Sequence, residues 1–367
     1  MPTERIVVKL GTTTLTDGTR RLSRPRMLEI VQQAAKLQQQ GHEIVIVSSG
    51  AVAAGRERLN YPDLGRSLPA KQMLSAVGQS RLMQIYGELF DIFEITVAQV
   101  LLTRDDLGNR TRFLNARDTL LTLIDRRIVP IINENDTTAT DEIRVGDNDN
   151  LSALVATLIE ADRLIILTDQ AGLYTADPRT NANAQLIQRV PRIDDQVWAL
   201  AGGSPTGLGT GGMITKLQAA QLATRGGIPT IIANGREPEL LVRLLRGESV
   251  GTRFDPVRDQ VVSRKRWLLM DKTRGKVLVD RGAAQKLLNG GASLLPVGVT
   301  GVEGEFERGT TLSVIAPDGK EIAHGLSSYS SDDIRQLCGV QSSKIHELLG
   351  YSYGDEIIHR NNMVLLS

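Results

Sequence analysis

The sequence predicts an α/β fold, a three-layer αβα sandwich with a mainly parallel open sheet, followed by a small, mostly β module. Two observations predict the sandwich. Six short runs rich in Val and Ile recur in the first 235 residues, and most are apolar on both faces, as in parallel strands covered by helices. Between these runs, apolar residues recur every three or four positions, which is typical of helices. Alternating strands and helices indicate helical layers on both faces of the sheet.

The order of these elements follows directly along the chain. The expected strands are residues 5–10, 42–49, 96–103, 128–134, 163–169 and 230–235. The expected helices are residues 24–40, 70–93, 112–127, 151–161 and 216–226.

The pattern changes after residue 255. A short polar, basic stretch leads into apolar runs at residues 275–280, 310–319 and 321–331, with glycines and other turn residues between them. A chain of 367 residues also suits two domains better than one. We therefore expect a domain at 1–255, a linker at 256–271 and a second domain at 272–367.

Composition excludes several classes of protein. The chain is 41% hydrophobic and 23% charged, with no apolar run long enough to cross a bilayer and no apolar leader at its start, so we expect a cytoplasmic protein without a membrane partner. Its one cysteine excludes an intrachain disulfide framework, and its four histidines lack the spacing of zinc ligands. No metal ligands are therefore assigned.

Charge gives no indication of a nucleic-acid-binding face. Lys and Arg number 29 against 29 Asp and Glu in residues 1–255, 4 against 2 in residues 256–271, and 10 against 11 in residues 272–367. Binding to a phosphate backbone requires a positive surface, which none of these segments supplies.

Polar residues follow four of the predicted strands. Ligands of open parallel sheets bind beyond the carboxyl ends of the strands. Lys9 lies near the end of the first strand, "SSG" from residue 48 ends the second, "NEND" from residue 133 ends the fourth, and Thr168 with Asp169 end the fifth. Each group alone is compatible with a simple turn, but four at one sheet edge indicate a binding site.

A glycine-rich stretch, "GLGTGGMITK" at residues 207–216, precedes the predicted helix at 216–226. It matches the dinucleotide fingerprint G-x-G-x-x-G, but no strand precedes it and no acidic residue follows the next strand. It is not a Walker loop, because Thr215 rather than glycine precedes Lys216. Exposed backbone amides before a helix that carries a lysine still suit a phosphate group, and a flexible glycine loop is the alternative.

Lys9 and Lys216 could face the same phosphates from opposite sides. Two ammonium groups held by a strand and a helix end can stabilise the charge that develops during phosphoryl transfer. A carboxylate acceptor is already ionised at pH 7, so it needs no general base.

These motifs, together with "VSSGAVAAG", "RFLNARDTL", "VGDNDNLSA" and "ILTDQAGLYTADPR", resemble the glutamate 5-kinase family within the amino acid kinase fold. Residues 292–334 resemble the PUA domain that many bacterial members carry. The resemblance implies ATP with phosphate-bound Mg²⁺, L-glutamate as substrate, phosphorylation of its γ-carboxylate as the first step of proline biosynthesis, and inhibition by proline. It also implies a homo-oligomer, a dimer or a tetramer.

The resemblance assigns roles to individual residues. Lys9 and Lys216 would steady the phosphates during transfer. Glutamate would be bound by Ser49, Gly50, Asp136 and Asn148. ATP would be bound by Lys9, Thr168, Asp169, Thr210, Gly211, Gly212, Met213, Ile214, Thr215 and Lys216. Charge complementarity places the substrate ammonium group at Asp136 and the substrate oxygens at Asn148 and Ser49. We expect Asp149 to orient the two lysines as a catalytic residue, and a simple helix cap is the alternative.

Two rival functions remain open. PUA domains recur in RNA-modifying enzymes, so the C-terminal module is a candidate for an accessory role in RNA binding, although its charge balance argues against strong binding. A related kinase that acts on a different carboxylate is the other alternative.

Overall fold

We describe the chain from a computed structural model, which describes residues 2–64, 67–139, 148–202, 212–257 and 273–366. The chain divides into two compact units. One comprises residues 1–107 and 119–260, and the other comprises residues 108–118 and 261–367. The predicted boundaries at 255 and 272 stay predictions, because most of the proposed linker lies outside the described residues.

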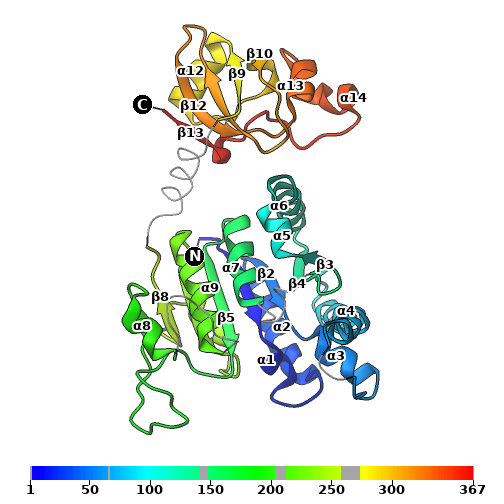
Figure 1. The fold of residues 1–367 in the computed structure, drawn as a ribbon, viewed down its shortest axis with the longest axis vertical. Coiled ribbons are helices and arrows are strands. Elements are labelled where there is room, and N and C mark those ends of the chain that lie inside the picture. The colour runs from blue at the N-terminus through cyan, green and yellow to red at the C-terminus, as the bar shows by residue number, and fades with distance from the viewer. Residues whose placement is uncertain (1, 65–66, 140–147, 203–211, 258–272, 367) are drawn as a thin grey trace. The chain divides into compact units, whose positions relative to one another are not determined.

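The first unit is built on a sheet with strand order β3-β4-β2-β1-β5-β7-β8-β6 (Figure 1). Its strands are β1 (Arg5–Leu10), β2 (Glu43–Ser48), β3 (Val97–Leu102), β4 (Val129–Glu134), β5 (Arg163–Thr168), β6 (Arg189–Val190), β7 (Thr230–Asn234) and β8 (Thr252–Phe254). The pairs from β3 to β7 are all parallel, whereas β8 pairs antiparallel with β7 and parallel with β6. The predicted mainly parallel sheet is confirmed.

Helices connect these strands in chain order. They are α1 (Thr12–Thr16), α2 (Arg24–Gln39), α3 (Ala51–Arg58), α4 (Leu68–Asp91), α5 (Arg104–Gly108), α6 (Arg110–Asp125), α7 (Asn148–Leu158), α8 (Asp195–Leu200), α9 (Met213–Arg225) and α10 (Leu240–Leu245). The starts of two long helices follow from the sequence. Ser23 and Ser67 cap α2 and α4 by accepting hydrogen bonds from backbone N–H groups three residues later, and a proline follows each cap in the first turn.

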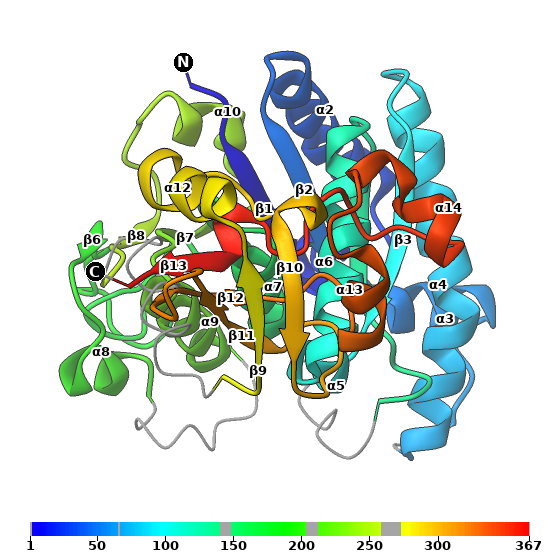
Figure 2. The ribbon, with the colours of Figure 1, turned by 90° about the horizontal axis from the view of Figure 1, so that it is seen from above.

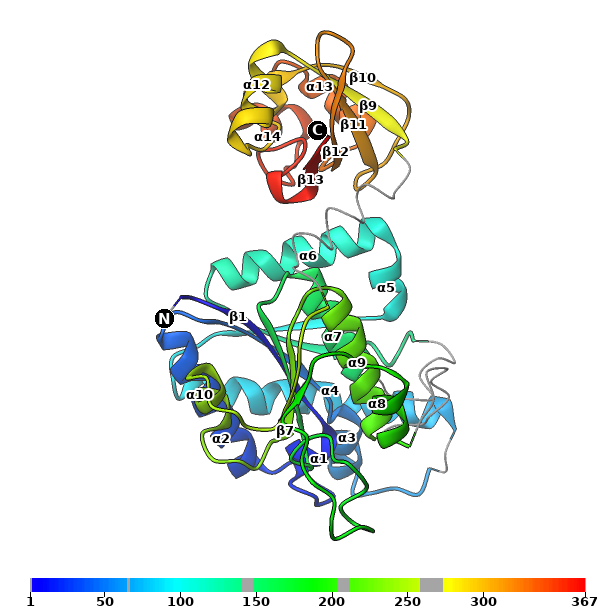
Figure 3. The ribbon, with the colours of Figure 1, turned by 90° about the vertical axis from the view of Figure 1, so that its left-hand side faces the viewer.

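The alternation of side chains along each strand divides the core between the two faces of the sheet. Ile6 and Val8 of β1 belong to one apolar cluster with residues of α2, α4 and α10. Val7, between them, is also fully buried and points to the opposite face. Figure 3 shows α7 and α9 on the side of the sheet opposite α2 and α10. Both faces are therefore covered, which explains why the middle residues of the central strands are apolar on both faces.

The second unit contains a mixed sheet with strand order β10-β9-β11-β12-β13 (Figure 2). Its elements are β9 (Gly275–Val279), α12 (Arg281–Gly290), η2 (Pro296–Gly298), β10 (Val299–Glu303), β11 (Thr311–Ile315), β12 (Glu321–Leu326), α13 (Ser331–Leu337), η3 (Ser342–Lys344), α14 (Ile345–Leu349), η4 (Arg360–Asn362) and β13 (Met363–Leu365). A separate apolar cluster, which includes Val277, Leu312 and Ile358, forms its core. The predicted small, mostly β module is confirmed.

Candidate functional site

The strand ends that carry polar residues meet at one edge of the sheet. Parallel pairing places Lys9 of β1 opposite Val47 of β2 and Ile166 of β5, so the residues that follow these strands emerge together. Thr168 ends β5, and its hydroxyl donates to a carboxylate oxygen of Asp169 at 3.1 Å. The carboxyl edge of the sheet is therefore the polar edge that the sequence predicts.

Two lysines and one aspartate form a buried charged cluster at this edge. Lys9 Nζ lies 2.5 Å from Asp149 Oδ1, and Lys216 Nζ lies 3.3 Å from Asp149 Oδ2. Lys9 comes from a central strand, Asp149 from the first turn of α7, and Lys216 from the first turn of α9. Lys9 and Asp149 are only 6% and 4% exposed. The cluster carries two positive charges and one negative charge, so it retains a net positive charge that suits an anion.

Asp149 holds both lysines through different oxygens and also accepts from a neighbouring hydroxyl. Thr215 donates to Asp149 Oδ2 at 2.7 Å, and this bond joins α7 to α9. Burial alone raises the pKa of Asp149, but the charges of Lys9 and Lys216 and hydrogen bonds from Lys9 and Thr215 outweigh burial and lower the pKa from 3.8 to about 2. Asp149 is therefore ionised at neutral pH.

The start of α9 is shaped by a glycine. Gly212 has a φ of 79°, in the left-handed region that glycine adopts without strain. Its carbonyl oxygen accepts from Lys216 Nζ at 3.2 Å and lies 3.1 Å from Thr215 Oγ1, which holds both side chains against the first turn. The turn thus fixes the lysine that enters the charged cluster.

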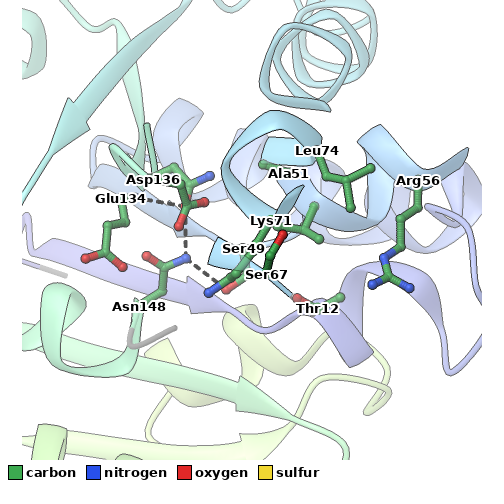
Figure 4. Close-up of a pocket in the computed structure, with 13 residues that line it drawn as sticks. Thr12, Ser49, Ala51, Arg56, Ser67, Lys71, Leu74, Glu134, Asp136 and Asn148 are labelled. Atoms are coloured by element: carbon green, nitrogen blue, oxygen red, sulfur yellow. Dashed lines mark hydrogen bonds between the residues drawn. The ribbon is translucent and has the colours of Figure 1, made fainter. Parts of the chain in front are cut away.

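A pocket of about 400 Å³ adjoins the charged cluster (Figure 4). Two short segments connect the pocket and the cluster: Asn148 lines the pocket and precedes Asp149, and Thr12 lines the pocket three residues after Lys9. The pocket residues are Thr12, Ser49, Gly50, Ala51, Val52, Arg56, Ser67, Lys71, Leu74, Asn133, Glu134, Asp136 and Asn148. The lining is polar and carries charges of both signs, which suits a small zwitterionic ligand.

One wall of the pocket depends on a close crossing of α3 and α4. A Cβ atom at Gly55 would lie 1.9 Å from the Leu74 carbonyl oxygen, and one at Gly78 would lie 1.8 Å from the Ala51 carbonyl oxygen. Only glycine permits the two backbones to approach this closely. Ala51 and Leu74 both line the pocket, so the crossing positions part of the site.

Gly50 turns the chain from β2 into α3. Its φ of 102° again lies in the left-handed region, and a Cβ atom there would lie 3.0 Å from Leu15 Cδ1.

The neighbouring Ser49 accepts a hydrogen bond from Asn148 Nδ2 at 2.9 Å, and Asp136 Oδ2 accepts from Ser75 Oγ at 2.5 Å. Both pocket residues are therefore held in place by their neighbours.

The structure brings most of the predicted residues together in two groups. Lys9, Asp149, Thr215 and Lys216 meet in the charged cluster, and Ser49, Gly50, Asp136 and Asn148 line the adjoining pocket. Met213 and Ile214 are half-buried at the start of α9, and Asp169 is exposed after β5. Thr210 and Gly211 lie outside the described residues.

Sequence reasoning missed Arg56 and Lys71, the two basic residues of the pocket. They lie in the last turn of α3 and the first turn of α4, where charged residues most often face solvent. Neither residue directly follows a strand, so the strand-end pattern gives no indication of them. The clue in the sequence is the glycine pair 55 and 78, which brings these two helices together at the pocket wall.

The described residues place limits on metal and membrane sites. In the part of the chain that the structure describes, no three His, Cys, Asp or Glu side chains gather in a way that could hold a metal ion. No helix among those residues has both the length and the apolar character needed to span a bilayer.

Comparison with known proteins agrees with this architecture. The model of the amino acid kinase family matches residues 4–234, and the model of the PUA domain matches residues 275–349. A glutamate 5-kinase from Herpetosiphon aurantiacus is 57% identical over 98% of both chains. A glutamate 5-kinase from Deinococcus radiodurans is 53% identical over 99% of this chain and 100% of its own.

A solved structure shares the fold of the first unit. A carbamate kinase from Giardia lamblia bound to AMP-PNP aligns with a TM-score of 0.51 at 18% identity, and covers 69% of this chain and 98% of its own. At this identity the likeness supports the fold alone.

Proposed function

The chain belongs to the glutamate 5-kinase family, within the amino acid kinase family, and on this premise we propose that it transfers the γ-phosphoryl group of ATP to the γ-carboxylate of L-glutamate. The products are ADP and L-glutamyl 5-phosphate, in the first step of proline biosynthesis. The observation that carries the proposal is the adjacency of a cationic, buried cluster and a pocket lined by charges of both signs at the same sheet edge.

The charged cluster supports phosphoryl transfer. Lys9 and Lys216 provide two ammonium groups that neutralise charge on the transferred group and on the leaving oxygen of ADP. Asp149 fixes both ammonium groups and, with its low pKa, remains an anion that takes up no proton during the reaction. The proposed reaction requires no general base, because a glutamate γ-carboxylate is ionised at neutral pH. The enzyme therefore acts by positioning and by charge stabilisation.

The nucleotide is proposed to lie along α9 and the end of β5. Thr168, Asp169 and the segment from Thr210 to Lys216 are the proposed ATP-binding residues, and backbone amides at the start of α9 suit phosphate oxygens. Mg²⁺ would be carried by the phosphates and would neutralise part of their charge. Each Asp149 carboxylate oxygen lies within ion-pair distance of a lysine, so Asp149 is proposed to hold the lysines.

The pocket matches the charges of glutamate. A glutamate ion carries two carboxylates and one ammonium group, and the pocket presents Arg56 and Lys71 to the former and Asp136 to the latter. Ser49 and Gly50 lie where β2 meets α3, beside the phosphate side of the site, and are proposed to hold the γ-carboxylate. Inhibition by proline and assembly into a homo-oligomer belong to the same proposal, and both rest on family membership.

The acceptor specificity tests this proposal. ADP release is measured with glutamate, N-acetylglutamate, aspartate and carbamate, with hydroxylamine present to trap an acyl phosphate as its hydroxamate. We expect turnover and hydroxamate formation with glutamate, and at least a 100-fold lower kcat/KM with the others because they lack the free ammonium group or the chain length. Faster turnover of any other acceptor would assign the chain to a different reaction.

A further inference from the structure

Three polar residues of α4 contact residues that lie at or beside the proposed glutamate pocket. Ser75, Gln79 and Tyr86 recur at helical spacing, all are buried, and each contacts a residue at a strand end. Ser75 donates to Asp136, the Gln79 oxygen accepts from Asn133, and the Tyr86 hydroxyl lies 2.8 Å from Ser48 Oγ. The buried face of α4, a helix that also contributes Lys71 to the pocket, thus supports residues at the strand ends beside it.

Gln79 begins a network of hydrogen-bonded amide side chains. Asn133 Nδ2 donates to Gln79 Oε1 at 2.8 Å, and Asn148 Nδ2 donates to Asn133 Oδ1 at 2.9 Å. The three side chains are 8%, 3% and 8% exposed, and they come from α4, the end of β4 and the start of α7. Buried amides of this kind hold one orientation only if every neighbour agrees with it.

Backbone groups fix the orientation of the Asn148 and Asn133 amides in this network. The carbonyl oxygen of Ser48 can only accept, so the Asn148 atom 3.2 Å away must be the amino nitrogen. The N–H of Glu134 can only donate, so the Asn133 atom 2.9 Å away must be the carbonyl oxygen. Asn133 therefore turns its amino group towards α4, where Gln79 supplies the matching acceptor.

This orientation leaves Asn148 with its carbonyl oxygen available. Its amino nitrogen lies within hydrogen-bonding distance of acceptors on Ser48, Ser49 and Asn133, whereas its buried Oδ1 atom has no hydrogen-bond partner among the residues that the structure describes. Figure 4 shows Asn148 in the pocket wall between Glu134 and Ser49. An acceptor in that position suits a donor on the substrate, which differs from the sequence-based expectation that Asn148 binds substrate oxygens.

We propose that Gln79 is a positioning residue for the ammonium group of the amino-acid substrate, acting through Asn133 to hold the Asn148 carbonyl oxygen towards the pocket beside Asp136. This inference rests on the proposed function, because it assigns parts of glutamate to parts of the same pocket. Without Gln79, the buried Asn133 amino group has no acceptor among the described residues. The Asn133 side chain then rotates towards the pocket, where its amino group can donate to water. This rotation breaks the hydrogen bond between Asn133 and Asn148.

Three variants of the full chain test the proposal. Gln79→Leu removes the acceptor, and Gln79→Glu keeps an acceptor oxygen in the same place. Gln84→Leu is the matched control, because Gln84 lies on the exposed face of the same helix and bonds to Arg81 and Glu88 there. KM for glutamate, KM for ATP and the melting temperature are measured for each, together with the inhibition constant of glutarate, which has both carboxylates and no ammonium group.

We expect Gln79→Leu to raise KM for glutamate roughly tenfold, as leaving one buried donor unpaired implies. KM for ATP and the inhibition constant of glutarate are expected to change by less than about twofold, since neither ligand uses the Asn148 oxygen. Gln79→Glu should recover most of the glutamate affinity, and Gln84→Leu should behave as the wild type.

The inference is wrong if KM for glutamate is unchanged in Gln79→Leu, or if the constants for glutamate, ATP and glutarate all rise together. Failure of Gln79→Glu to recover affinity also contradicts it. A wild-type protein that does not phosphorylate glutamate would instead contradict the proposed function, so the two failures are distinguishable.

Discussion

Asp149 shows how one residue can serve both the fold and the proposed chemistry. It lies in the first turn of α7, where a simple helix cap is the alternative role. Its two carboxylate oxygens instead contact Lys9 of a central strand and Lys216 and Thr215 of α9. These contacts support the expectation that Asp149 orients the two lysines. They also indicate that its negative charge is what holds the two ammonium groups.

Replacement of Asp149 by Asn is expected to lower kcat by roughly 100-fold or more, because neither lysine is then fixed by a charge. KM for glutamate should change far less than kcat. Steady-state kinetics test this, with circular dichroism to show that the variant is folded. Asp194→Asn, at the cap of α8, is the control and should retain wild-type kcat. A wild-type kcat in Asp149→Asn would show that the aspartate only supports the helix.

The low pKa of Asp149 also predicts how stability depends on pH. A carboxyl group whose pKa is lower in the folded state stabilises the fold above its unfolded pKa, and this contribution is lost as pH falls through the folded value. For Asp149 that window extends from about pH 4 to about pH 2. The difference in unfolding free energy between wild type and Asp149→Asn should shrink by about 2 kcal/mol across it. Urea unfolding at several pH values measures the difference, and a constant difference would contradict the pKa.

Most residues of the candidate site could be predicted because they follow buried parallel strands or begin helices at the same sheet edge. Lys9, Ser49 and Asp136 are found in this way. The orientation of the Asn148 amide could not be predicted, since it depends on the Ser48 carbonyl and on Asn133, which only the packed structure brings into contact. Pairings of this kind have no signature in sequence spacing.

At the scale of elements, the crossing of α3 and α4 is the least tolerant feature of the pocket. Gly78→Ala would place a methyl group against the Ala51 backbone, so the helices must separate. We expect a loss of roughly 3 kcal/mol in unfolding free energy, together with a higher KM for glutamate.

Gly87 offers a matched control on the same helix, because a Cβ atom there would have no atom of the described residues within 4 Å. Gly87→Ala should leave kinetics unchanged and raise stability by up to about 1 kcal/mol, since alanine is the better helix former. Urea unfolding measures both variants. Equal stability of Gly78→Ala and Gly87→Ala would show that the crossing tolerates a side chain.

The long elements could be predicted from the sequence, whereas the short ones could not. The expected helix at 70–93 is observed as Leu68–Asp91, and the expected strand at 163–169 as Arg163–Thr168. The two-residue strand β6 and the three-residue strand β8 could not be predicted, because two or three residues are too few to show the hydrophobic periodicity of a strand. These strands form because β8 pairs with β6 on one side and with β7 on the other.

At the scale of the whole molecule, the alternation of strands and helices determines the class of fold but not the strand order. Chain order offers no reason for β1 to lie between β2 and β5, or for β3 to lie at the edge. That order decides which strand ends become neighbours, and hence which polar residues form one site. The prediction of a shared site was possible only because all ligands of such sheets gather at one edge.

The second unit has its own apolar core, and residues 272–367, which make up most of it, carry a nearly balanced charge of 10 basic and 11 acidic residues. All residues proposed for catalysis and substrate binding lie between residues 9 and 216. The proposed chemistry therefore draws on the first unit, and RNA binding by the PUA domain stays a prediction.

In the proposed reaction, a glutamate carboxylate oxygen attacks the γ-phosphorus of ATP. Glutamate labelled with ¹⁸O in its carboxylates, ATP and hydroxylamine are incubated with the enzyme, and the released phosphate is analysed by mass spectrometry. Attack by the carboxylate forms an acyl phosphate whose bridging oxygen comes from glutamate, and hydroxylamine then displaces phosphate by attacking the carbonyl carbon. We predict one ¹⁸O atom in each phosphate and glutamate γ-hydroxamate as the other product. Phosphate without ¹⁸O would show that water, and not the carboxylate, is the acceptor.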